Sequence, residues 1–135
     1  ELVLVGSLEH LPEAQRNYPG IRALSGVSDA ELHGLYRKAS RLWQPSYAEG
    51  FGLPVIEALS VGTPVAVASG TSLDEITPPL APRFSPTDGA ALVQLMLHLA
   101  DQPIEQPPEQ LRSWAERFNH QAYRRRLAEL IEELN

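Results

Sequence analysis

The sequence predicts an α/β protein, a doubly wound parallel sheet with helices on both faces. Short continuous apolar runs, typical of strands that are buried on both sides, alternate along the chain with segments in which apolar residues recur at helical spacing. The 135 residues, 43% of them hydrophobic, are enough to build a core. We therefore expect one domain over residues 1–135.

Five short segments carry the predicted strands. The first begins at the second residue, and nothing precedes it that could form a neighbouring strand, so we expect a fragment whose fold is incomplete at its N-terminus. The fifth strand is only two residues long. The predicted strands are residues 2–5, 21–24, 41–44, 64–68 and 83–84.

The predicted helices follow from spacing and from signals at their ends. Ser28 and Glu31 form a capping box before apolar residues at positions 32, 35, 36 and 39. A shorter helix over residues 53–59 has Pro54 in its first turn and stops at Gly62. A proline-containing loop, 102–108, interrupts the later part of the chain. The remaining helices are predicted at residues 88–100, 111–118 and 123–134.

In a sheet of this kind, right-handed crossovers bring the carboxyl ends of all strands to one edge, where ligands bind. The loops at that edge hold most of the glycine and serine of the chain. They are residues 6–20, 25–29, 45–53 and 69–74.

Composition excludes several classes of function. Eleven basic and seventeen acidic side chains give a net charge of −6, which makes nucleic acid an improbable partner. The chain has no cysteine, no apolar run long enough to span a bilayer and no leader-like N-terminus, so we expect a soluble, cytoplasmic protein. The four histidines show no metal-ligand spacing, so we predict no metal site.

The loop over residues 45–53 holds the strongest candidate site. Gly50 and Gly52 bracket Phe51 directly before a helix, so backbone N–H groups and the helix dipole can meet an anion there. Glu49 and Glu57 flank this turn. A carboxylate beside a phosphate site is well placed to accept hydrogen bonds from sugar hydroxyls, so the pattern suits a nucleotide sugar.

Residues 26–76 closely resemble the donor-binding half of the GT-B glycosyltransferases of family 4, the retaining group 1 enzymes. Glu49 and Glu57 match the E-x7-E motif of that family. The frame around them also matches, in the order Pro-Ser, Glu-Gly-Phe-Gly-Leu-Pro, Glu-Ala and Gly-Thr-Pro-Val. The resemblance implies the Rossmann-like C-terminal domain of a two-domain enzyme, here without the acceptor-binding domain and the Arg- and Lys-bearing segment that normally precede it.

The resemblance also implies roles for individual residues. Glu49 would contact the transferred sugar and take part in catalysis, and Glu57 would bind the ribose hydroxyls. The amides from Gly50 through Leu53 would meet the sugar and the diphosphate.

A second contact would come from the turn before the first long helix. By resemblance, the backbone of Gly26, Val27 and Ser28 would lie against the base of the nucleotide.

The implied activity is transfer of a sugar from a GDP-sugar or UDP-sugar with retention, without a metal or other cofactor. Residues 71–76 resemble a subgroup in which GDP-mannose is common, which favours mannose. The implied partners are the nucleotide-sugar donor, the acceptor-binding domain and, for the intact enzyme, a membrane surface that it contacts peripherally. We also expect the isolated fragment to be inactive and to self-associate through exposed apolar surface.

Other interpretations remain open. The chain could be a sugar-nucleotide-binding or interaction module without turnover, or a dimerisation domain built on its last two helices. Residue by residue, Glu57 could be a first-turn helix acid, Glu49 a solvated loop acid and the two glycines a tight turn. The segment 69–72 could be a plain turn and cap.

Overall fold

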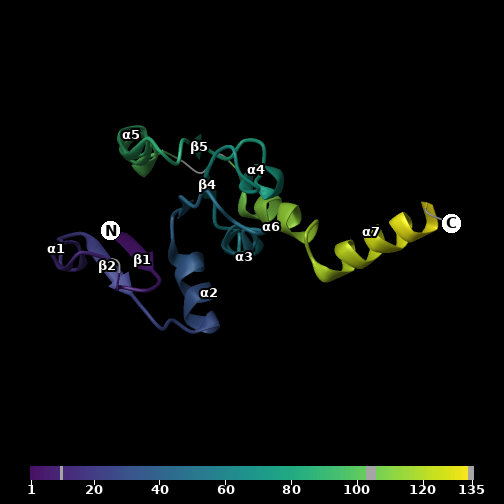
Figure 1. Cartoon of the computed structure of the whole chain (residues 1–135), viewed down its shortest axis with the longest axis horizontal. Coiled ribbons are helices and arrows are strands. Elements are labelled where there is room, and N and C mark those ends of the chain that lie inside the picture. The colour runs from purple at the N-terminus through teal and green to yellow at the C-terminus, as the bar shows by residue number, and fades with distance from the viewer. Residues whose placement is uncertain (10, 103–105, 134–135) are drawn as a thin grey trace. The chain divides into compact units, whose positions relative to one another are not determined.

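The computed structural model describes residues 1–9, 11–102 and 106–133 (Figure 1). The chain divides into two compact units, Glu1–Leu35 and Tyr36–Asn135, and each is described by itself.

The first unit is built on two parallel strands, β1 (Leu2–Val5) and β2 (Ile21–Leu24). Their bounds are those predicted, and Leu2 lies opposite Ile21. The connection between them contains a one-turn helix, α1 (Glu13–Arg16), which the sequence analysis missed because four residues are too few to show a period.

Helix α2 (Asp29–Lys38) begins with the predicted capping box. The Ser28 amide donates to Glu31 Oε2 at 2.8 Å, and the Glu31 amide donates to Ser28 Oγ at 3.4 Å. Hydrogen bonds from the Ser28 hydroxyl and then the Ser28 amide lower the pKa of Glu31 below its ordinary value. The last three residues of α2 belong to the second unit.

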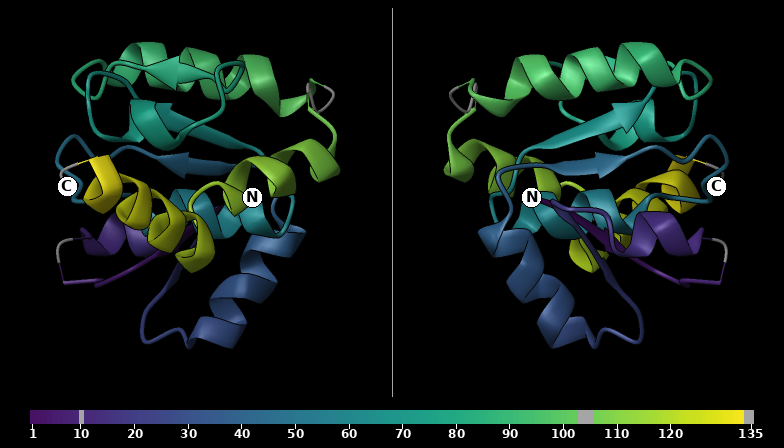
Figure 2. Two further views of the ribbon diagram at one scale, coloured as in Figure 1. Left: turned by 90° about the vertical axis from the view of Figure 1, so that its right-hand side faces the viewer. Right: turned by 90° about the vertical axis from the view of Figure 1, so that its left-hand side faces the viewer.

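The second unit holds a parallel sheet in the order β3 (Leu42–Gln44), β4 (Val65–Ala68) and β5 (Arg83–Phe84). All of β4 is buried. On one face, Ala66, Ala68 and Phe84 pack with Trp43 and with two leucines of α5 (Gly89–Ala100), which runs beside β5 (Figure 2). Helix α3 (Leu53–Ser60) contacts β3 and β4, and α6 (Pro108–Glu116) packs on α3.

These pairings confirm the α/β class with parallel strands flanked by helices. Within the first unit β1 pairs with β2, and within the second unit β3, β4 and β5 pair in that order. The third and fourth strands each start one residue later than predicted, at Leu42 and Val65.

Most of the later helices agree with the prediction, with shifted ends. Asp88 lies before α5 as its N-cap and accepts a hydrogen bond from the Ala91 amide at 2.9 Å. Helix α6 starts at Pro108, which we had placed in the preceding loop, because proline fits the first turn of a helix. Residues 103–105 of that predicted loop lie outside the described part of the chain.

Helix α7 (His120–Glu133) presents apolar side chains to solvent. Tyr123, Leu127, Leu130 and Ile131 are 45–67% exposed. The predicted helix position 134 lies outside the described residues. Within the described part of the chain, no helix is long and apolar enough to cross a membrane.

Arg83, on β5, ties down the proline-rich segment that precedes it. Its Nε donates to Asp74 Oδ1 at 2.9 Å, and its two terminal nitrogens donate to backbone carbonyls. Prolines in this segment restrict its backbone, and the guanidinium supplies donors to its oxygens. The accepting carbonyls belong to Thr77, Pro78, Pro79 and Ala81.

Candidate functional site

The candidate site in the second unit starts where β3 ends and reaches the first turns of α3. Gly52 is the N-cap of α3, is buried and has φ +84°, a conformation that favours glycine. A Cβ at this position would lie 2.5 Å from Leu73 Cδ2 and 2.8 Å from Ile76 Cδ1. The glycine therefore lets the turn approach α4 (Leu73–Ile76), a second one-turn helix that the sequence analysis did not predict.

Gly50 differs from Gly52 in its surroundings. It is exposed, and a Cβ built on it would meet nothing within 4 Å. Leu53 and Phe51 are also exposed, by 60% and 45%, and the Phe51 ring meets Phe118 edge-on with centroids 6.2 Å apart. One glycine of the predicted pair thus serves packing, while the surface around the other stays accessible.

Glu49 is half-buried and held at two points. Gln44 Nε2 donates to its Oε1 at 2.6 Å, and the Ser72 hydroxyl donates to its backbone oxygen at 2.8 Å. A loop acid that is merely solvated would not need both contacts. Sequence reasoning missed Gln44 as a partner, because a glutamine at a strand end carries no motif.

Glu57 lies one turn into α3 and is also half-buried. Its Oε2 accepts a hydrogen bond from the Tyr36 hydroxyl at 3.3 Å. Tyr36 is itself fixed through its backbone oxygen, which accepts from the buried Thr63 hydroxyl at 2.6 Å. Sequence reasoning assigned Tyr36 only to the apolar face of its helix.

The Tyr36–Glu57 pair should make the free energy of unfolding fall at alkaline pH. Burial, then the charge of Glu57 and then the hydrogen bond to it raise the pKa of Tyr36 well above its ordinary value of 10.0. Because the pKa of Tyr36 is raised in the folded chain, its hydroxyl contributes fully to the free energy of unfolding below pH ~10. That contribution is lost as the pH rises above ~10, because the tyrosine of the unfolded chain releases its proton first. We expect Tyr36→Phe to weaken the decline in unfolding free energy between pH 9 and 11, measured by urea denaturation.

The exposed Tyr47 supplies the control for this prediction. Tyr47→Phe should keep the alkaline decline of the wild type. Equal pH dependence in wild type and Tyr36→Phe would show that the pair does not have the expected effect.

Helix α4 and the turn before it support the Glu49 loop. The Gly70 amide donates to Asp74 Oδ2 at 2.7 Å, and Arg83 Nε donates to Asp74 Oδ1. Burial acts to raise the pKa of Asp74, but the Gly70 amide, Arg83 and the Thr71 amide together outweigh it, so the pKa is lowered. Ser72, which holds Glu49, therefore sits in a turn fixed by an ion pair.

Gly26, Val27 and Ser28 belong to the first unit. Gly26 has φ +63° and is exposed, and Val27 is half-buried. The Ser28 hydroxyl and amide are both engaged with Glu31 in the capping box. The structure therefore brings the residues from Glu49 to Glu57 together in one unit and leaves the predicted base contact in the other.

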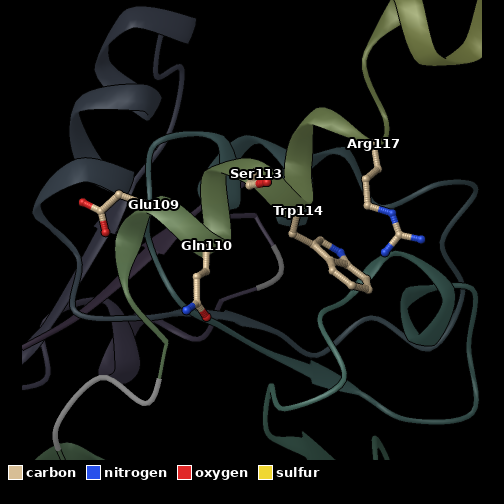
Figure 3. A pocket seen from close by; sticks show the side chains of 5 residues that line it. All are labelled: Glu109, Gln110, Ser113, Trp114 and Arg117. Carbon is tan, nitrogen blue, oxygen red and sulfur yellow. The ribbon is translucent and has the colours of Figure 1, made fainter.

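A shallow hollow of about 350 Å³ lies along α6 (Figure 3), and none of the predicted site residues lines it. Arg117 stacks over the ring of Trp114 with its guanidinium carbon 4.2 Å from the ring centroid, and Trp114 Nε1 donates to the Ile76 oxygen at 2.7 Å. Hydrogen bonding and stacking account for both side chains. We therefore place the candidate site at the Glu49 loop rather than at this hollow.

The carboxylate acceptors and the helix start around the Glu49 loop suit a polyhydroxylated anionic ligand. Carboxylates accept from hydroxyl groups, and a helix N-terminus favours negative charge. Within the part of the chain that the structure describes, no three His, Cys, Asp or Glu side chains gather in a way that could hold a metal ion.

A glycine turn between the carboxyl end of a parallel strand and the start of a helix is a place where α/β proteins commonly bind ligands. The comparison with known families is more specific. The family model for glycosyl transferases group 1 matches residues 1–117, and the chain belongs to this family.

Similar proteins include several bacterial glycosyltransferases. The O-antigen chain mannosyltransferase B of Escherichia coli is 48% identical over 56 residues, which are 42% of this chain and 15% of that protein. The MMP alpha-(1->4)-mannosyltransferase of Mycolicibacterium hassiacum is 35% identical over 63% of this chain and 21% of its own length. The D-inositol 3-phosphate glycosyltransferase of Corynebacterium kroppenstedtii is 31% identical over 85% of this chain. The chain spans 15–26% of the length of these relatives.

Proposed function

We propose that this chain is the donor-binding part of a retaining GT-B glycosyltransferase of family 4. The intact protein would transfer a hexose from a nucleotide diphosphate sugar to an acceptor bound elsewhere. The observation that carries the proposal is the pair Glu49 and Glu57, which flank a glycine-capped helix start in a chain of the group 1 family. Mannose is the favoured sugar, because two of the similar proteins named above are mannosyltransferases.

In the proposed mechanism the chain binds the donor and stabilises the departing diphosphate. The amides from Gly50 to Leu53 would donate hydrogen bonds to it, and the dipole of α3 would stabilise its negative charge, without a metal ion. Glu57 would hold the ribose hydroxyls at a distance from the reacting carbon. Glu49 would lie beside the sugar, where positive charge develops as the bond to the diphosphate lengthens. Gly26, Val27 and Ser28 would meet the base through their backbone.

Turnover by the full-length protein tests this proposal. Purified protein is incubated with GDP-mannose, GDP-glucose, UDP-glucose or UDP-galactose, and release of the nucleoside diphosphate is measured with and without a cell-envelope acceptor extract and with EDTA. We expect release from GDP-mannose in particular, dependent on acceptor and unaffected by EDTA. Binding of a donor without release under any condition would favour the non-catalytic module.

The 135-residue chain alone should bind nucleoside diphosphates weakly, in about the mM range, because amide N–H groups and a helix dipole make weaker contacts with an anion than charged side chains do. Titration with GDP and with UDP, followed by amide chemical-shift mapping, measures this affinity. Shifts should be centred on residues 49–57 and 26–28. Inorganic phosphate serves as the control for a general anion effect, and shifts confined to other residues would contradict the proposed site.

A further inference from the structure

Gln44 is the last residue of β3, and its side chain reaches forward to the loop that follows. Its backbone lies opposite Val67 of the fully buried strand β4, so its position is set by the sheet. The side chain is half-buried. The same amide nitrogen donates to Ser46 Oγ at 3.1 Å and to Glu49 Oε1 at 2.6 Å. A side-chain amide whose backbone is held in the sheet thus donates a hydrogen bond directly to the Glu49 carboxylate.

Two hydrogen bonds together restrict the orientation of Glu49. Ser72 fixes its backbone oxygen and Gln44 engages one carboxylate oxygen, so Oε2 is the oxygen that neither of these bonds uses. The group on Gln44 that donates this hydrogen bond is a neutral amide, which orients the Glu49 carboxylate and leaves its negative charge intact. A lysine or arginine in the same place would offset that charge.

We propose that Gln44 is a positioning residue that directs the Glu49 carboxylate toward the sugar of the donor. This inference rests on the proposed function, since it concerns the residue placed beside the transferred sugar. A carboxylate contributes to a transition state only when it is held in the productive geometry, and small misplacements are costly. Gln44 acts through Glu49 and is not assigned a contact with the donor.

The first test replaces Gln44 by methionine, which keeps the length of the side chain and removes the donor. In the full-length protein, Gln44→Met should lower kcat about ten- to a hundred-fold, with KM for the nucleotide sugar changed less than about two-fold. The matched control is Gln94→Met on the exposed side of α5, which should retain wild-type kinetics.

A double-mutant cycle shows whether the effect passes through Glu49. If it does, Gln44→Met should cause no further loss of kcat when it is added to Glu49→Gln. Independent, multiplicative losses from the two substitutions would overturn the inference, because Gln44 would then act on something other than Glu49.

A second variant keeps the inference testable should Gln44→Met fold poorly. In Gln44→Glu, a protonated carboxyl at position 44 can again donate to Glu49 at low pH, whereas two charged carboxylates at this separation repel one another. The kcat of Gln44→Glu relative to wild type should therefore rise at least five-fold as the pH falls from 8 to 5.5. A pH-independent ratio would contradict the positioning role.

The outcomes separate the two proposals. Wild-type protein that turns over no nucleotide sugar means that the proposed function is wrong. Active wild-type protein whose kcat is unchanged by Gln44→Met means that the proposed function stands and the positioning role of Gln44 is wrong.

Discussion

Replacing Glu49 by glutamine in the full-length protein is expected to lower kcat about a hundred-fold or more, with a smaller change in KM for the donor. The substitution keeps the volume of the side chain and removes its charge. If Glu49 lies beside the sugar, its carboxylate interacts more strongly with the positively charged transition state than with the ground state, and loss of such a group reduces turnover. Steady-state kinetics with GDP-mannose measures both constants.

Glu57→Gln is the matched comparison, because it makes the same chemical change at the other carboxylate of the motif. Glu57 would bind ribose hydroxyls in the ground state and transition state alike, so its loss should weaken donor affinity by about 1–3 kcal/mol and leave kcat nearly unchanged. If Glu49→Gln and Glu57→Gln weakened donor affinity equally and left kcat unchanged, Glu49 would have no role in stabilising the transition state. If neither variant had an effect, both acids would be structural.

Gly52→Ala is expected to destabilise the chain by about 2–5 kcal/mol. An alanine at φ +84° costs about 1–2 kcal/mol, and its Cβ would overlap the side chains of Leu73 and Ile76, which adds the ~1–3 kcal/mol typical of overpacking. Against a total stability of roughly 5–15 kcal/mol, this is a large loss. Urea denaturation and thermal unfolding of the 135-residue chain measure it.

Gly50→Ala provides the control for that measurement. Position 50 has open space around it and a backbone that alanine adopts without strain, so the change in unfolding free energy should stay within about 0.5 kcal/mol. Comparable losses at the two positions would mean that the contact between the glycine turn and α4 is not the cause.

Periodicity was a sufficient guide wherever an element was long or fully buried. The apolar run of β4 and the capping box of α2 each depend on residues close together in the sequence, and both were predicted to within a residue. The helices α1 and α4 have four residues each, too few for a pattern to appear. Which strands pair within each unit depends on tertiary contacts, which apolar runs do not specify.

The sequence predicted the two acids of the candidate site but not the residues that form hydrogen bonds to them. Glu49 and Glu57 stand out because of their spacing around the two glycines. The residues that hold them are Gln44, Tyr36 and Ser72. In the sequence these belong to the end of a strand, the face of a helix and a turn, and none of them is part of a motif. Tyr36 and Ser72 lie more than twenty positions from the acids they contact, so only the folded chain brings them there.

The hydrogen bonds of Arg83 have a consequence for how sequences with this fold vary. Lysine carries one ammonium group with three donors and could not reach both Asp74 and four separate carbonyls as the planar guanidinium does. An exchange of arginine for lysine at this position, ordinarily counted as conservative, would leave carbonyl oxygens of the segment 77–81 without these donors. We therefore expect the arginine and the proline-rich segment to be inherited together, and homologues that lack one to lack the other.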